Sequence, residues 1–210
     1  MAEAPVGLNV RGARTSYMGR LALLLVLAIF ALSAFVALRA CDDTASTGVQ
    51  TVKVGGQWFH LEIADTNAVR MKGLGQRTHI EDDGGMLFVF PAPQLARGSG
   101  FVMRDCPIDI DIIYLDGSGR IGNWHAMKAA PRGPSEGQVG ETGYDANGNE
   151  VPMSTGAQEY EKRLHRYEPR YDYQFAIELK GGTIENRLKG KLKEGDKIDM
   201  PLEALKKHAK

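Results

Sequence analysis

The stretch that decides the fold runs from Phe101 to Asp116 and reads FVMRDCPIDIDIIYLD. From residue 108 to residue 115 every even position is apolar, whereas the odd positions begin with two aspartates and turn apolar at Ile113 and Leu115. Alternate side chains of a strand point to opposite faces of a sheet. The pattern therefore predicts a core strand with one apolar face and, on the other face, a polar entrance.

Alternating apolar stretches and turn residues on both sides of this strand predict a small, mainly β domain. Gly55-Gly56 separates two alternating runs and indicates a β-hairpin. A side-chain oxygen of Asp65 or Thr66 can cap a first short helix, and Thr183 can cap a later one. We expect strands at 51–54, 58–63, 85–91, 120–127, 173–179 and 197–200, a short helix at 67–72 and a helix turn at 183–188, while residues 158–167 could form a short polar surface helix.

The most apolar part of the chain is residues 21–38, which Ser33 alone interrupts with a polar side chain. A helix of this length spans about 27 Å, close to the ~30 Å hydrocarbon core of a bilayer. Three arginines precede the segment, one follows it, and then come Asp42 and Asp43. The positive-inside rule predicts a cytoplasmic N-terminus and an extracytoplasmic main domain, as in a single-pass protein of the bacterial inner membrane.

Other interpretations of the same segment stay open. A buried core helix fits less well because the segment has no polar face, and a cleaved signal peptide usually has a shorter apolar region. Residues 38–41 resemble a bacterial lipoprotein cleavage box that ends at Cys41, although Arg39 is unusual there. Lipidation of Cys41 and an uncleaved helix both predict a domain tethered to the outer side of the membrane.

The overall composition describes a globular protein and excludes some partners. The net charge of the 210 residues is zero, but residues 1–41 carry four arginines and one glutamate, so the remainder is mildly acidic. Proteins that bind nucleic acid need a basic surface, so we do not expect a nucleic acid partner. The two cysteines, Cys41 and Cys106, make neither a disulfide scaffold nor a zinc knuckle.

The aspartates around the central strand are the first candidates for chemistry. Asp105, Asp109 and Asp111 share one face if the strand is unbroken. Carboxylates spaced in this way suit a cation or an acid/base pair, so Asp109 and Asp111 are candidate catalytic or metal-binding residues. The alternative is a solvated face whose charge Arg77 or Arg70 neutralises.

The other reactive residues are weaker candidates for a catalytic or metal-binding site. Cys106 follows an aspartate, which raises the pKa of a thiol, and it lacks a base unless His125 or His79 lies near it. The five histidines lack the spacing of zinc ligands. The chain has no phosphate-binding loop, no GxSxG elbow and no HExxH motif, and we expect no cofactor.

Several stretches occur in an order that resembles domain-of-unknown-function family number 192. They are Gly73-Leu74-Gly75-Gln76-Arg77, Gly85-Met86-Leu87-Phe88-Val89-Phe90, Phe101-Val102-Met103, Asp111-Ile112-Ile113-Tyr114-Leu115-Asp116, Glu178-Leu179 with Gly181, and Gly195-Asp196. The resemblance implies a compact, barrel-like domain over residues 50–200, often behind a signal or anchor. It implies no catalytic residue, because the family's activity is unknown.

The resemblance also singles out residues that match the family pattern and residues that depart from it. Arg77 and Asp111 match, and a guanidinium group forms a two-pronged contact with a carboxylate. We therefore expect either an internal Arg77–Asp111 pair or capture of an anionic ligand by Arg77. The family usually has a Trp at Val102, a Lys-Asn-Thr-like triplet at 104–106 and a Pro at Asp109.

Residues 131–172 form an insertion that is longer than the usual loop of the family. A structureless loop of this length is uncommon in a compact domain. The insertion is rich in tyrosine, a residue that provides a large contact area at a low entropy cost. We expect it to bind a partner, such as another subunit of a membrane complex, through Tyr144, Tyr160, Tyr167 and Tyr171.

Together these observations predict an α+β fold dominated by a barrel-like antiparallel sheet with one or two short helices. The expected organisation is a cytoplasmic segment at 1–20, a transmembrane helix at 21–40, a linker at 41–49, the β-rich domain at 50–200 and a basic tail at 201–210. A binding or accessory function is the expectation. The alternative is a small hydrolase or cation-dependent enzyme that uses Asp111 and Arg77.

Overall fold

The structure, a computed structural model, describes residues 48–145 and 149–210. The apolar segment 21–38 and Cys41 lie outside the described residues. Within the described ranges, no helix is both long enough and apolar enough to cross a membrane.

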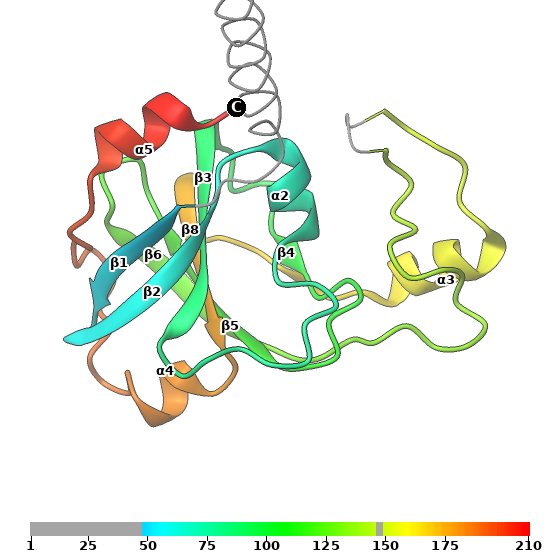
Figure 1. The fold of residues 1–210 in the computed structure, drawn as a ribbon, viewed down its shortest axis with the longest axis horizontal. Coiled ribbons are helices and arrows are strands. Elements are labelled where there is room, and N and C mark those ends of the chain that lie inside the picture. The colour runs from blue at the N-terminus through cyan, green and yellow to red at the C-terminus, as the bar shows by residue number, and fades with distance from the viewer. Residues whose placement is uncertain (1–47, 146–148) are drawn as a thin grey trace, which may run out of the picture. The chain divides into compact units, whose positions relative to one another are not determined.

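The described part of the chain is built on a six-stranded sheet (Figure 1). The strand order is β1-β2-β3-β8-β5-β6. The strands are β1 (Val49–Val54), β2 (Gln57–Ala64), β3 (Gly84–Gln94), β5 (Ile110–Leu115), β6 (Ile121–Met127) and β8 (Tyr173–Lys180). Two further strands, β4 (Phe101–Val102) and β7 (Arg166–Tyr167), form a separate two-stranded sheet.

This topology corrects the prediction of a barrel-like antiparallel sheet. The β2 and β3 strands are parallel, because the connection through residues 65–83 returns the chain to the same end of the sheet. The sheet is also open, with β1 and β6 as its edges. Residues 197–200, predicted as a last strand, make only an isolated bridge between Lys197 and Arg120, so they do not extend the sheet.

The predicted core strand is confirmed as β5, which pairs with β6 and β8 and is buried along its whole length. Its predicted central position is wrong, because β5 lies next to the edge strand β6. Its alternating side chains enter two hydrophobic clusters on opposite faces of the sheet. Ile113 and Leu115 join the cluster that residues 188–205 cover. Ile112 and Tyr114 join the second cluster, which contains Leu74, Met103 and Cys106.

The residues that the structure describes contain four helices: α2 (Asn67–Lys72), α3 (Thr155–Arg163), α4 (Thr183–Asn186) and α5 (Leu202–His208). Thr66 caps α2 as predicted, with its hydroxyl accepting from the Val69 N–H. The predicted cap at Thr183 is wrong, because Gly182 occupies the N-cap position of α4 and offers no side chain. In Figure 1, α3 of the insertion lies to one side of the sheet, beyond α2 and β4.

Candidate functional site

The two aspartates at the start of the core strand have separate structural roles. Asp109 precedes β5, and its carboxylate lies 2.7 Å from Lys128 Nζ and accepts from the Ala129 N–H at 2.8 Å. Asp111 lies within β5 and accepts from the Ile184 N–H at 2.6 Å. Asp111 thus supplies the cap that α4 lacks from its own sequence. Burial is the main cause that raises the pKa of the Asp111 carboxyl.

The expected pair between Arg77 and Asp111 does not form. Arg77 makes a two-pronged contact with Glu62, at 2.5 and 2.7 Å. Asp111 points to the same face of the sheet as Ile113, whereas Glu62 lies on the face of Ala64. The two residues that match the family pattern therefore lie on opposite sides of the sheet.

No metal centre is assembled from the candidate carboxylates. Across residues 48–145 and 149–210, no three His, Cys, Asp or Glu side chains come close enough together to hold an ion. Asp105 does not belong to the strand that contains Asp111. It lies in a turn at φ 54°, a left-handed conformation that aspartate tolerates better than most residues.

The Asp105 carboxylate anchors the insertion to the domain. Arg132 Nε lies 2.8 Å from Asp105 Oδ1, and both side chains are almost wholly buried, at 2% and 5% exposure. The Gly140 N–H also donates to Asp105, at 2.9 Å. Next to it, Arg104 forms a two-pronged contact with Glu161 of α3, at 2.6 and 2.7 Å. Residues 104 and 105 depart from the family pattern, and both contact the insertion.

The four predicted partner-binding tyrosines have different environments. Tyr160 is fully buried; its hydroxyl donates to the Ala130 carbonyl at 2.6 Å, and its ring lies under Arg132. The Tyr167 hydroxyl accepts from the Lys128 N–H. Only Tyr144 and Tyr171 are exposed, so only they can present their rings to a partner.

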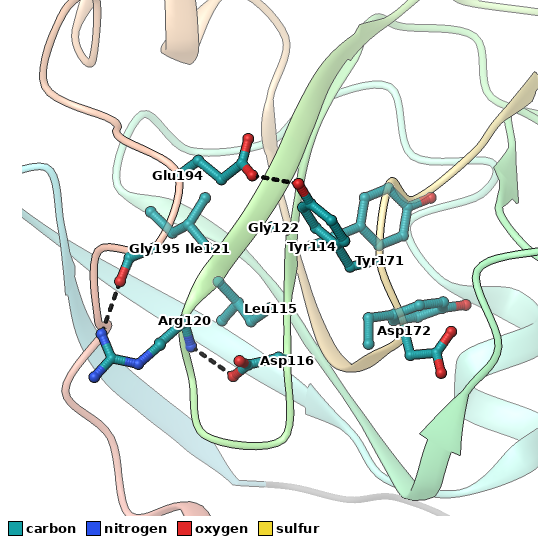
Figure 2. Close-up of a pocket in the computed structure, with 11 residues that line it drawn as sticks. Tyr114, Leu115, Asp116, Arg120, Ile121, Gly122, Tyr171, Asp172, Glu194 and Gly195 are labelled. Carbon is teal, nitrogen blue, oxygen red and sulfur yellow. Dashed lines mark hydrogen bonds between the residues drawn. The ribbon is translucent and has the colours of Figure 1, made fainter.

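Tyr171 lines a pocket of about 200 Å³ at the turn between β5 and β6 (Figure 2). Its hydroxyl lies 2.7 Å from Glu194, and Arg120 donates to the Gly195 carbonyl at 2.9 Å. Figure 2 shows these groups directed at one another across the pocket wall. The polar groups that define this pocket therefore already have partners.

A second cavity contains a polar group without a partner. Glu178 of β8 has 6% exposure, and its Oε2 atom has no hydrogen-bond partner among the described residues. Burial raises the pKa of the Glu178 carboxyl to about 8, although the Leu74 N–H and the charge of Arg77 oppose the shift. Gly73 approaches closely, since a Cβ there would lie 3.7 Å from Oε2.

The walls of this cavity come from four of the stretches that carry the family resemblance. They are Gly73-Leu74-Gly75, Phe88, Phe101-Val102 and Glu178. Cys106 also lines the cavity, and burial raises the pKa of its thiol to about 12, with Glu178 as a further cause. The thiol is therefore a poor nucleophile at neutral pH.

The sequence reasoning treated Glu178 only as part of a family motif. A signal was available, because Glu178 is the one acidic residue in a strand whose positions 173–179 are all buried. The histidines considered as bases for Cys106 have other neighbours. His125 lies 2.8 Å from the Glu168 carbonyl, and His79 lies 3.2 Å from Glu81.

Comparisons with known proteins agree with the resemblance. The model of domain-of-unknown-function family 192 (DUF192), described as "Uncharacterized ACR", matches residues 50–200. No curated protein matches the sequence significantly.

Two solved structures are similar to the chain. One is a protein of unknown function from Novosphingobium aromaticivorans DSM 12444, with 25% identity over 76% of this chain and 89% of that chain and a TM-score of 0.49. The other is a putative transcription regulator from Sinorhizobium meliloti 1021, with 19% identity over 72% and 90% and a TM-score of 0.43. On the family match over residues 50–200, the chain belongs to DUF192, a family of uncharacterised proteins.

Proposed function

We propose that this chain is a membrane-anchored accessory protein whose DUF192 domain lies outside the cytoplasm and binds another subunit of a membrane complex through the insertion 131–172. The apolar segment 21–38 and the arginines before it support the anchor and its orientation. A single-span tether keeps such a domain beside a membrane-embedded partner.

The observation that carries the binding function is the buried ion pair between Asp105 and Arg132. It attaches the insertion to the domain core, while Val139, Tyr144 and Val151 of the insertion stay exposed, at 62%, 48% and 41%. Tyr144 pairs with Glu150, and the Val151 N–H donates to Gly143, so two of the three are held close together. Apolar side chains on a pre-ordered loop lose less conformational entropy on binding than those on a free loop.

The alternative of a hydrolase or cation-dependent enzyme has less support. It requires Asp111 and Arg77 to face one pocket. Asp111 caps α4, whereas Arg77 is paired with Glu62 on the other side of the sheet. The arrangement therefore favours binding over catalysis at these residues.

Affinity purification of the full-length protein from washed bacterial membranes tests partner and location together. We expect the protein in the membrane fraction with at least one co-purifying membrane protein. A Tyr144→Ser/Val151→Ser variant should lose that protein, because it removes the apolar contact area and leaves the Asp105–Arg132 pair intact.

The matched control is Trp58→Ser, which removes a large apolar side chain that is 58% exposed on β2. It should retain the partner. If the double variant recovers the same proteins as the wild type, the insertion is not the binding surface. If the wild-type protein is released from membranes by alkaline carbonate, the anchor is wrong.

A further inference from the structure

The Glu178 cavity lies over the middle of one face of the sheet and not at its edge. Glu178 is directly opposite Met86 of β3 and Ile112 of β5, so its backbone is held by strands on both sides. Its side chain points toward the face covered by α2 and by residues 101–106. The carboxyl group is buried there, and its Oε2 atom has no hydrogen-bond partner among the described residues.

The cavity adjoins a wider groove on the same face of the domain. The inner cavity has a volume of about 50 Å³ and the outer groove about 220 Å³. Six residues line both, which makes them one continuous depression: Arg70, Met71, Phe88, Phe101, Val102 and Arg104. Phe90 and Tyr173 extend the apolar wall of the groove outward. The shape suits a small molecule with a polar head and an apolar body.

The charges around the cavity favour a ligand with an anionic head group over one with a cationic head group. Arg70, Lys72 and Arg104 line it, and Glu178 is the only acidic residue in its lining. Glu178 is protonated at neutral pH, because burial raises its pKa to about 8, and its Oε2 can then donate a hydrogen bond. Arg104 is already paired with Glu161. A cationic head would therefore meet the charges of Arg70 and Lys72 and no free carboxylate in the lining. An anionic head would meet both the basic rim and a hydrogen-bond donor.

We propose that this depression is a binding site for small organic carboxylates, in which the ligand carboxylate accepts a hydrogen bond from Glu178 and the apolar part of the ligand lies in the groove formed by Phe88, Phe101 and Tyr173. A hydrogen bond between a carboxylic acid and a carboxylate is charge-assisted and therefore strong. Val102 is important for access, because its small side chain lines both the inner cavity and the outer groove.

Binding depends on pH through Glu178, and the other groups that face it do not titrate in the same range. Arg77, from the segment after α2, and the rim arginines Arg70 and Arg104 stay charged, because a guanidinium group does not lose its proton in this range. Burial raises the pKa of Cys106 to about 12 and raises that of Tyr114 of β5 further, so both stay neutral. Loss of the Glu178 proton converts a donor into a second negative charge, which repels the ligand.

The test uses the full-length protein in lipid nanodiscs and isothermal titration calorimetry with hexanoate, with empty nanodiscs as the blank. Hexanoate should bind saturably at pH 6.5 and at least tenfold more weakly at pH 9.5. Hexylamine, which has the same chain and the opposite charge, should not bind. Glu178→Gln keeps a donor and cannot ionise, so it should bind hexanoate equally at both pH values.

Two further variants distinguish a loss of ligand binding at the pocket from a loss of the fold. Val102→Trp should fill the groove and abolish binding, since Val102 lines both the inner cavity and the groove, and its melting temperature checks that the fold is kept. Glu81→Gln, at an exposed glutamate outside the cavity, should bind as the wild type does. Absence of saturable hexanoate binding by the wild type, binding of hexylamine, or an unchanged pH dependence in Glu178→Gln would each overturn the proposal. None of these results depends on the insertion or its partner.

Discussion

Asp105 shows how a single residue can connect a family domain to an insertion. Its backbone adopts φ 54°, and its carboxylate meets Arg132, which lies 27 positions later in the chain. A buried ion pair contributes little when compared with an apolar pair, but removal of one partner leaves the other charge buried and unpaired. The pair therefore fixes where the insertion sits more than it adds net stability.

This asymmetry gives a prediction for Asp105→Ala. The substitution should lower the free energy of unfolding by about 3–5 kcal/mol, since the Arg132 guanidinium loses its buried partner. Asp109→Ala is the matched control because its Lys128 pair is exposed, so its loss should cost much less. Urea denaturation followed by circular dichroism measures both, and equal losses for the two variants would contradict the buried role of Asp105.

At the scale of elements, α4 depends on the strand it packs against. The helix has only four residues, and its N-cap glycine provides no side-chain acceptor. Asp111 of β5 accepts from the Ile184 N–H across the chain and satisfies one of the free amides of the first turn. A carboxylate that resembled part of an acidic site in the sequence is thus a cap that links two elements.

The cap can be tested by comparing two substitutions. Asp111→Ala should destabilise the domain by about 1 kcal/mol, the usual cost of losing an N-cap acceptor. Asp111→Asn keeps an acceptor oxygen of the same shape and should cost less. Amide hydrogen exchange at Ile184 should accelerate in Asp111→Ala alone; equal exchange rates in the two variants would show that Asp111 does not cap α4.

At the scale of the whole molecule, the sheet separates two cores with different chemistry. The face covered by residues 188–205 is filled mainly by apolar side chains, and its buried carboxylate, Asp111, accepts a hydrogen bond from the Ile184 N–H. The opposite face contains Glu178 among apolar neighbours and has a depression above it. The fold thus keeps a carboxyl group inside its second core, where ionisation is unfavourable.

This arrangement makes the stability of the domain depend on pH. The pKa of Glu178 is about 8 in the folded protein and near the ordinary 4.5 in the unfolded chain, so between these values the folded state holds an extra proton. The contribution of Glu178 to the free energy of unfolding is complete below about pH 4.5. It is lost as the pH rises to about 8, where the free energy of unfolding falls by up to about 1.4 kcal/mol per pH unit.

Glu178→Gln removes this titration and provides the measurement. Urea unfolding at several pH values from 5 to 9 should show that the variant gains stability relative to the wild type as the pH rises. Glu81→Gln is again the control, because its side chain is 77% exposed and should leave the profile unchanged. Parallel profiles for the wild type and Glu178→Gln would show that the Glu178 pKa is not raised.

The amino-acid sequence by itself determined the core strand, the hairpin around Gly55-Gly56, the capped helix α2 and the family. These features depend on local rules: alternation at a period of two, turn residues, and a side-chain acceptor next to the first helical amides. The continuous apolar run at 85–91 likewise predicted the buried part of β3.

Only the tertiary structure decided which charged residues meet. Whether Arg77 pairs with Asp111 or Glu62 depends on which face of the sheet each strand residue occupies, and a shift of one residue reverses the face. The partners of Asp105 and the burial of Glu178 Oε2 without a hydrogen-bond partner among the described residues likewise arise from segments distant in the sequence. Local patterns specify elements, whereas these contacts follow from strand order and register, which no local pattern contains.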